Sequence, residues 1–179
     1  MGISVSDMQR KMRKTNRQVY SVDWINDVLD RADVLSLGLC TSDGMPYVIP
    51  IRFGRDGNII YIHSSLRGLK TEIIKDNPRV AFSAWVDVER HPRPNTTMDK
   101  WKQQYRCVCG QGRIETVTDN AEKLHAVDVI KTHYKESLEN YRIEQSVLEK
   151  LLGIYAIHME HVTGRVKGYE NPDMPGVKP

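Results

Sequence analysis

The feature that most constrains the fold is a run of short apolar segments that alternate with polar residues and are separated by glycine turns. Residues 34–41 place leucine at every second position, and similar segments follow at 47–53 and 58–63. The turns between them are Ser42-Asp43-Gly44 and Arg55-Asp56-Gly57. Alternation buries one face of a strand, and Asp-Gly turns join antiparallel neighbours. These three segments therefore predict an antiparallel meander.

The rest of the chain continues as strands interrupted by amphipathic helices. Pro50 cannot donate to a strand ladder, so its strand lies at an edge, a bulge or a split, and Gly110 and Gly112 mark a bulge or bend. Six antiparallel strands with flanking helices predict a mainly β (α+β) fold, a closed or partly split barrel. The further expected elements are helices at 21–32, 64–77, 118–134 and 143–152, and strands at 79–88, 104–117 and 154–167.

The length of 179 residues fits one domain, which we place at 21–170 between a basic extension (1–20) and a loose tail (171–179). No segment of 18 apolar residues and no apolar leader is found, so we expect no membrane contact and a cytoplasmic location. A net charge of +3 is too small to indicate nucleic-acid binding. The basic extension is better explained as a solvated or packing arm than as a nucleic-acid contact.

The three cysteines are expected to be buried and reduced, with Cys107 and Cys109 on one face of a strand. No cysteine or histidine spacing indicates a metal site. His158 and His161, three residues apart on a strand, are expected on opposite faces.

The most informative segment runs from His63 to Thr71, where a strand ends and a helix begins. The free N–H groups of a first helical turn attract anions, and Ser64, Ser65, Arg67 and Lys70 add donors and charge, which indicates a phosphate site. The alternative is that Ser65 is an ordinary helix cap and that the cations are solvated. His63 could contact a ligand, or it could be structural. No hydrolase motif is present.

In order and spacing, these motifs resemble the pyridoxamine 5'-phosphate oxidase-like split-barrel superfamily, and most closely its nitroimidazole-resistance (Nim-type) branch. The resemblance covers residues 10–168. It rests on MRKTNR (12–17), LGLCTSDGMPYVIPIRF (37–53), IYIHSSLRGLK (60–70), NPRVAFSAW (77–85), GQGRIE (110–115) and VTGRVKG (162–168).

The resemblance implies a homodimer that binds FMN, or sometimes FAD, in clefts between its subunits. It places the strand 47–53 along the flavin ring and assigns the phosphate to Lys70 and Thr71. Trp101, Arg106 and Arg113 are candidate contacts from the second subunit. The full set of implied cofactor contacts is Val48, Ile49, Pro50, Ile51, Ile62, His63, Ser64, Ser65, Lys70 and Thr71.

The activity that the resemblance implies is that of a flavin-dependent reductase of Nim type, acting on a small organic acceptor such as a nitroaromatic or a quinone. His63 is the candidate proton donor to that acceptor. Two alternatives stay open: a haem-binding barrel with His63 or His158 as axial ligand, and a flavin carrier without enzymatic activity.

Overall fold

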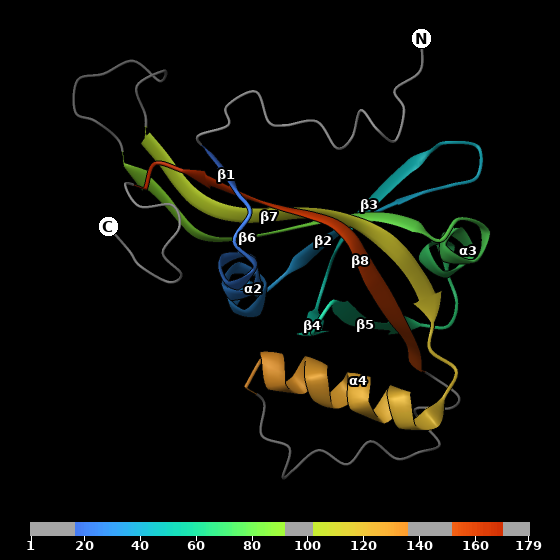
Figure 1. Cartoon of the computed structure of the whole chain (residues 1–179). Helices are drawn as coiled ribbons and strands as arrows, with labels where there is room; N and C mark the ends of the chain where they lie inside the picture. Colours follow the sequence, from blue (N-terminus) through green and yellow to red (C-terminus); the bar gives the residue numbers. More distant parts are fainter. Residues whose placement is uncertain (1–16, 92–101, 136–151, 170–179) are drawn as a thin grey trace.

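The computed structural model describes residues 17–91, 102–135 and 152–169 (Figure 1). The predicted extension except its last four residues, the whole predicted tail, and the predicted helix at 143–152 except its last residue lie outside these ranges. None of the described helices is long and apolar enough to cross a membrane. The elements are β1 (Gln18–Val19), α2 (Val22–Arg31), β2 (Leu35–Cys40), β3 (Pro46–Ile51), β4 (Phe53–Asp56), β5 (Ile59–Ser65), α3 (Leu69–Asp76), β6 (Arg79–His91), β7 (Lys102–Thr116), α4 (Asn120–His133) and β8 (Leu152–Lys167).

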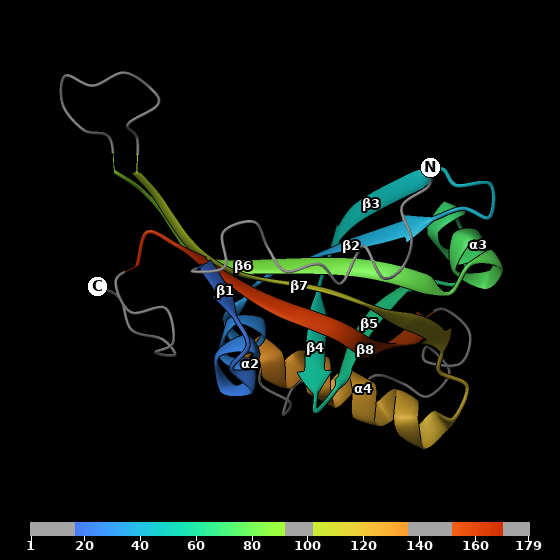
Figure 2. The same cartoon turned by 45° about the horizontal axis from the view of Figure 1, so that its top comes forward.

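The described strands form one antiparallel sheet in the order β3-β2-β6-β7-β8-β5-β4, with β1 paired to β8 (Figure 2). This confirms the predicted α+β split-barrel class. The described sheet has eight strands rather than six, because β1 was not predicted and the expected strand at 47–53 is divided at Arg52.

The division at Arg52 is what splits the barrel. Before it, β3 pairs with β2, and after it, β4 pairs with β5 at the other end of the strand order. The predicted meander was therefore wrong in its middle strand, which contributes its two halves to opposite ends of the sheet. Pro50 lies on the terminal strand β3, as the expectation of an edge position predicted.

The interior of the curved sheet holds the main core. Helix α2 begins at the cap Ser21, whose Oγ accepts a hydrogen bond from the Trp24 amide at 3.3 Å. Its apolar face inserts Trp24, Val28 and Leu29, which are fully buried. A smaller second core lies between α4 and the outer side of β4, β5 and β8. The close approach of α4 requires Gly54, where a Cβ would lie 2.7 Å from Ile130 Cα.

The two predicted glycine irregularities have different causes. Gly110 lies opposite Phe82 on β6, and a Cβ there would overlap the Phe82 ring. Gly112 is at a true bulge, where the β7–β8 register shifts. The bulge adds a residue to β8, so Met159 and Val162 both pack toward the core, and His158 and His161 both lie on the outer face. The expectation of opposite faces was therefore wrong.

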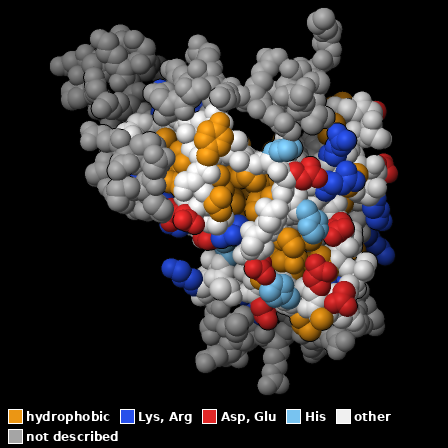
Figure 3. Space-filling view, in the orientation of Figure 1, with side chains coloured by type: hydrophobic (Ala, Val, Ile, Leu, Met, Phe, Trp, Pro, Cys, Tyr) orange, Lys and Arg blue, Asp and Glu red, His pale blue; other side chains and the backbone are white. Residues whose placement is uncertain are grey.

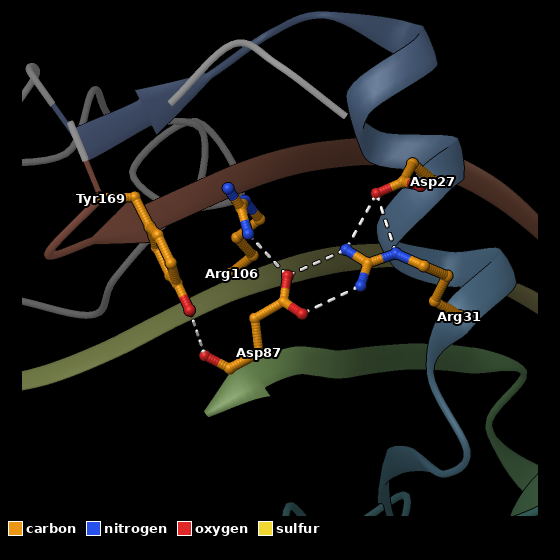
Figure 4. A network of polar contacts seen from close by, with 5 residues as sticks. All are labelled: Asp27, Arg31, Asp87, Arg106 and Tyr169. Carbon is orange, nitrogen blue, oxygen red and sulfur yellow. Dashed lines mark hydrogen bonds and ion pairs between the residues drawn. The ribbon is translucent and has the colours of Figure 1, made fainter. Parts of the chain in front are cut away.

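A buried polar network joins α2, β6, β7 and the end of β8 (Figure 4). Asp87, at positive φ (54°) beside a bulge in β6, receives two bonds from Arg31 at 3.0 Å and one from Arg106 at 2.6 Å. The Tyr169 ring lies 4.0 Å from the Arg106 guanidinium, and its hydroxyl donates to the Asp87 carbonyl at 2.8 Å. Arg106 is 1% exposed, so its charge depends on Asp87 for compensation.

Candidate functional site

The junction between β5 and α3 presents the first turn of a helix without a side-chain cap. Gly68 is the N-cap of α3, with φ 116°, and among the described residues this helix end has no side-chain cap hydrogen bond. By contrast, α2 and α4 are capped by Ser21 and Asp119. Ser65 is not the cap, because its Oγ accepts from the Arg67 amide at 3.2 Å within the loop. The uncapped N–H groups of α3 can therefore receive an anion.

Lys70 adds a cation to this helix end. Its side chain is half-buried, and desolvation lowers the pKa of its ammonium group. None of the ion pairs found among the described residues involves Lys70. A partly desolvated charge without an acidic partner is unfavourable, and an anion placed beside it would restore its stability.

Thr71, whose side chain is buried, fixes the shape of the β5–α3 junction. Its side chain is 5% exposed and its hydroxyl donates to the Ser65 carbonyl at 3.1 Å. The hydroxyl of buried Tyr155 donates to the Thr71 Oγ1 at 3.4 Å. Thr71 thus holds the end of β5 against α3, and it is its backbone, at the start of the helix, that faces the candidate anion site.

Two unpaired strand edges extend from the division at Arg52. The β4–β5 pairing begins with Phe53 opposite Ile62, so in the described sheet it does not extend to Ser64 and Ser65 at the end of β5. The outer edge of β3 is likewise unpaired, since β3 is terminal. The backbone N–H and C=O groups of β3 that face away from β2 are therefore available to a planar polar ligand.

Tyr134, which the sequence did not indicate, fixes the corner where these edges meet. Its hydroxyl accepts from the Phe53 amide at 3.1 Å and donates to the Asp33 carbonyl at 2.8 Å. The Arg52 guanidinium lies 3.9 Å from the Tyr134 ring centre. The end of α4 thereby sets the angle at which β3 and β4 separate.

The structure groups the predicted site residues along this split. Val48 and Pro50 are exposed on β3, Ile49 and Ile51 are half-buried against the core, and His63 and Ser64 are half-buried on β5. Ile62 is fully buried, so only its backbone can contact a ligand. The sequence analysis missed Leu66 and Leu69, which are 41% and 55% exposed beside the anion site.

Of the candidates for a contact from a second subunit, Arg106 is excluded. It is fully buried and paired with Asp87 in its own protomer. Arg113 is exposed, and Trp101 lies outside the described residues.

A hollow of about 550 Å³ lies between α2, β4 and α4, away from the β5–α3 junction. Its charged groups include mutual pairs: Arg55 bonds Asp30 at 2.7 Å, and His125 lies 2.8 Å from Asp56. Figure 3 shows acidic and histidine side chains over α4, whereas lysine and arginine gather on the side where α3 lies. The electrostatics therefore favour the β5–α3 junction as the anion site.

Three solved structures resemble this fold. A candidate 5-nitroimidazole antibiotic resistance protein from Bacteroides thetaiotaomicron is 22% identical, with a TM-score of 0.72 over 83% of this chain and 86% of that one. The flavocytochrome Anf3 from Azotobacter vinelandii is 19% identical, with a TM-score of 0.76 over 91% and 75%. A FAD-binding protein from Mesorhizobium loti is 24% identical, with a TM-score of 0.60 over 85% and 98%.

Comparison with curated proteins gave no match. Comparison with family models gave a match: residues 21–166 match the pyridoxamine 5'-phosphate oxidase model. This range includes the β5–α3 junction, strands β2 to β7, and β8 up to Val166. Family and fold thus agree with the resemblance seen in the motifs. The chain belongs to the pyridoxamine 5'-phosphate oxidase family.

Proposed function

We propose that this protein binds a flavin, FMN in the first instance, with the phosphate at the N-terminus of α3 and the ring along the unpaired edge of β3. The observation that carries the proposal is the half-buried Lys70 ammonium beside an uncapped helix end. A phosphate there would accept bonds from the first-turn amides and from Lys70. The solved structures that share the fold include a FAD-binding protein and a FAD- and haem-binding protein, which supports the same ligand class.

The flavin ring would lie at the split, between the outer edge of β3 and the end of β5. Backbone groups of Val48 to Ile51 would meet its polar edge, and His63 with Ser64 and Ser65 would follow the chain that links ring to phosphate. The β3 residues and the β5 residues lie near the same corner of the sheet. Ile51, at the end of β3, is two residues before Phe53, and Phe53 pairs with Ile62 on β5. In the described sheet β3 pairs with β2 alone, so backbone contacts to its other side would break no strand pairing.

A homodimer would complete the site. Beside β3 and at the start of α3, Met45, Val48 and Leu69 are 64%, 67% and 55% exposed, apolar side chains that a partner could cover. A second copy covering this side would bury that surface and exclude water from the other face of the ring.

We propose a flavin-dependent reductase of a small organic acceptor, such as a nitroaromatic or a quinone. A bound flavin supplies the hydride and single-electron chemistry, and the protein supplies position and exclusion of water. His63, half-buried on β5, is our candidate to hold the proton that the acceptor takes up. This role distinguishes the proposal from a flavin carrier, which would need no such group.

The first test is the visible spectrum of the purified protein, with the released cofactor identified by mass. Absorption near 450 nm and a mass equal to FMN or FAD are the expected result. Bleaching by NADH or NADPH and recovery on adding a nitroaromatic would establish turnover. A haem spectrum, or no flavin uptake on titration, would overturn the proposal.

The second test compares two lysines of the same helix. Lys70→Ala removes a bond to a charged phosphate, which contributes about 1.5–3 kcal/mol, so FMN affinity should fall roughly tenfold to a hundredfold. Lys75→Ala, in the exposed last turn of α3, is the matched control and should leave affinity unchanged. Flavin fluorescence titration measures both, and equal affinities in the two variants would place the phosphate elsewhere.

A further inference from the structure

Two arginines, at the start of β6 and near the end of β7, form a pair that the proposed flavin contacts do not use. Arg79 and Arg113 are directly opposite each other in the β6–β7 ladder, and both are exposed. At the next position, the Ile114 amide donates to the Pro78 carbonyl at 2.8 Å, so Arg79 and Arg113 are a non-hydrogen-bonded pair. The Cβ atoms of such a pair are about 4.5 Å apart. Two guanidinium groups are therefore anchored side by side on one face of the sheet.

The face of β7 that carries Arg113 is the outer one, and this corrects an expectation about the cysteines. Val108 is fully buried, so Cys107 and Cys109 on either side of it point outward with Arg113. Cys109 is exposed, and Cys107 is half-buried. The expectation that the thiols are buried was therefore wrong.

The charges of the two arginines are not compensated within the described part of the chain. None of the hydrogen bonds or ion pairs found among the described residues involves either guanidinium group. Glu115, two residues after Arg113 on the same face, is bound by His158 at 2.7 Å. Like charges directly opposite each other on adjacent strands are destabilising. An anion between the two side chains would remove this repulsion.

The backbone positions of the pair are fixed by contacts on both sides. The Arg79 amide donates to Asn77 Oδ1 at 3.1 Å, and Asn77 Nδ2 donates to the Cys40 carbonyl at 3.0 Å. Gly112, beside Arg113, packs against the His158 carbonyl without room for a Cβ. The strands therefore hold the two arginines together, and the repulsion is relieved either by side chains that turn apart into solvent or by a shared anion.

We propose that Arg79 and Arg113 together bind one phosphate dianion of a small molecule. A guanidinium group pairs with phosphate oxygens through two parallel N–H···O bonds, and a dianion compensates both positive charges at once. A carboxylate carries a single charge and would leave the other arginine uncompensated. The dianion is supplied either by inorganic phosphate or by the phosphate ester of a small organic molecule.

This site is separate from the one proposed for the flavin phosphate. Lys70 lies in the first turn of α3, whereas Arg79 follows the end of this helix, which has eight residues and is about 12 Å long. A phosphate bound by the first-turn amides of α3 would therefore leave the arginine pair open. The arginine site does not require that the protein binds a flavin.

The test measures binding of inorganic phosphate and of phenyl phosphate to the full-length protein by isothermal titration calorimetry at pH 7.5. Arg79→Gln and Arg113→Gln should each weaken binding roughly tenfold to a hundredfold, because each removes bonds to a charged group. Lys75→Gln, an exposed cation in the last turn of α3, is the matched control and should leave binding unchanged. Lys70→Ala should also keep this binding. Tighter binding of phenyl phosphate identifies an ester as the source of the dianion, and tighter binding of inorganic phosphate identifies the free anion.

Thermal unfolding gives a second measurement, which an arginine pair with a purely structural role would not affect. Phosphate should raise the Tm of the wild type above its value in chloride of equal ionic strength, and it should not do so for Arg79→Gln. In chloride, Arg79→Gln should be at least as stable as the wild type, because it removes one of two like charges. The effect of phosphate should decrease from pH 7.5 to pH 5, since phosphate takes up a proton with a pKa of about 6.

Four outcomes would overturn the proposal. They are equal phosphate affinity in the wild type and both arginine variants, a loss of phosphate binding confined to Lys70→Ala, acetate bound as tightly as phosphate, and weaker flavin binding in Arg113→Gln with phosphate binding intact. The last outcome would assign Arg113 to the flavin of a second subunit. Flavin affinity in Arg79→Gln should equal that of the wild type, so failure of the arginine site and failure of the flavin site are measured separately. Native circular dichroism is checked first for each variant.

Discussion

At the scale of single residues, Asp87 is the carboxylate that compensates the buried guanidinium of Arg106. It is 7% exposed and bonds both Arg31 and Arg106. Removing one partner of a buried pair leaves the other charge uncompensated, so Asp87→Asn should lower the free energy of unfolding by about 3 kcal/mol. Asparagine also tolerates the positive φ at this position, which confines the effect to the lost charge.

Urea denaturation of Asp87→Asn beside Asp27→Asn measures this effect. Asp27 pairs with the same Arg31, but near the surface, so its replacement should lower the free energy of unfolding by less than about 1 kcal/mol. Similar losses in the two variants would show that Arg106 is compensated by another group.

The same Asp87 carboxylate makes part of the free energy of unfolding depend on pH in the acid range. The hydrogen bond from Arg31 is the largest cause that lowers the pKa of Asp87; burial opposes it, and Arg106 adds to it. A group whose pKa is lowered by folding stabilises the protein above its unfolded pKa of about 3.9, and this stability is lost as the pH falls through the folded value. The difference in unfolding free energy between wild type and Asp87→Asn should therefore shrink from pH 5 to pH 3 in urea titrations. A constant difference would contradict this origin.

At the scale of elements, the sequence predicted those strands and helices that depend on contacts between residues close in the chain. Alternation located β2, β5, β6, β7 and β8, and helical spacing of apolar residues located α2 and α4, because each depends on neighbours within a few residues. The phosphate candidate at Lys70 was predicted in the same way, since an anion site at a helix start is a local arrangement.

What the sequence did not predict depends on distant contacts. The apolar pattern of 47–53 is continuous, and its division at Arg52 is marked by Tyr134, about eighty residues away in the chain. The bulge that puts His161 on the outer face arises from pairing with β7, and the partners of Asp87 come from α2 and β7. Alternation within one strand contains none of this information.

The attachment of α4 can be tested at Gly54. An alanine Cβ there would lie 2.7 Å from Ile130 Cα and from the Val129 carbonyl, both backbone atoms that cannot rotate away. Gly54→Ala should push α4 outward and lower the free energy of unfolding by about 1–3 kcal/mol, with faster amide exchange in α4. Gly38→Ala, whose Cβ would meet its nearest atom at 3.4 Å, is the control and should cost much less. Unchanged exchange in α4 would mean that β4 yields instead.

At the scale of the whole molecule, the proposed flavin site and the proposed homodimer both depend on the division of the sheet at Arg52. A sheet that divides at Arg52 exposes two backbone edges and the apolar side chains around them, and these features are unfavourable in an isolated protomer. Ligand binding and pairing of two copies would remove the same unfavourable surface. Cofactor affinity and dimer affinity should therefore depend on each other.

Val48→Glu tests this coupling. Val48 is 67% exposed on the outer side of β3, and its side chain is not needed for the backbone contacts proposed to a flavin. A carboxylate there should weaken the dimer at least tenfold in sedimentation velocity, because a charge would be desolvated in the interface, and flavin affinity should fall with it. Leu124→Glu, on the opposite, α4-covered side and 50% exposed, is the control and should change neither. A wild-type protein that stays monomeric at every concentration yet binds flavin tightly would show that one protomer suffices for binding. The strand edges at the split would then be covered by the ligand and not by a second copy.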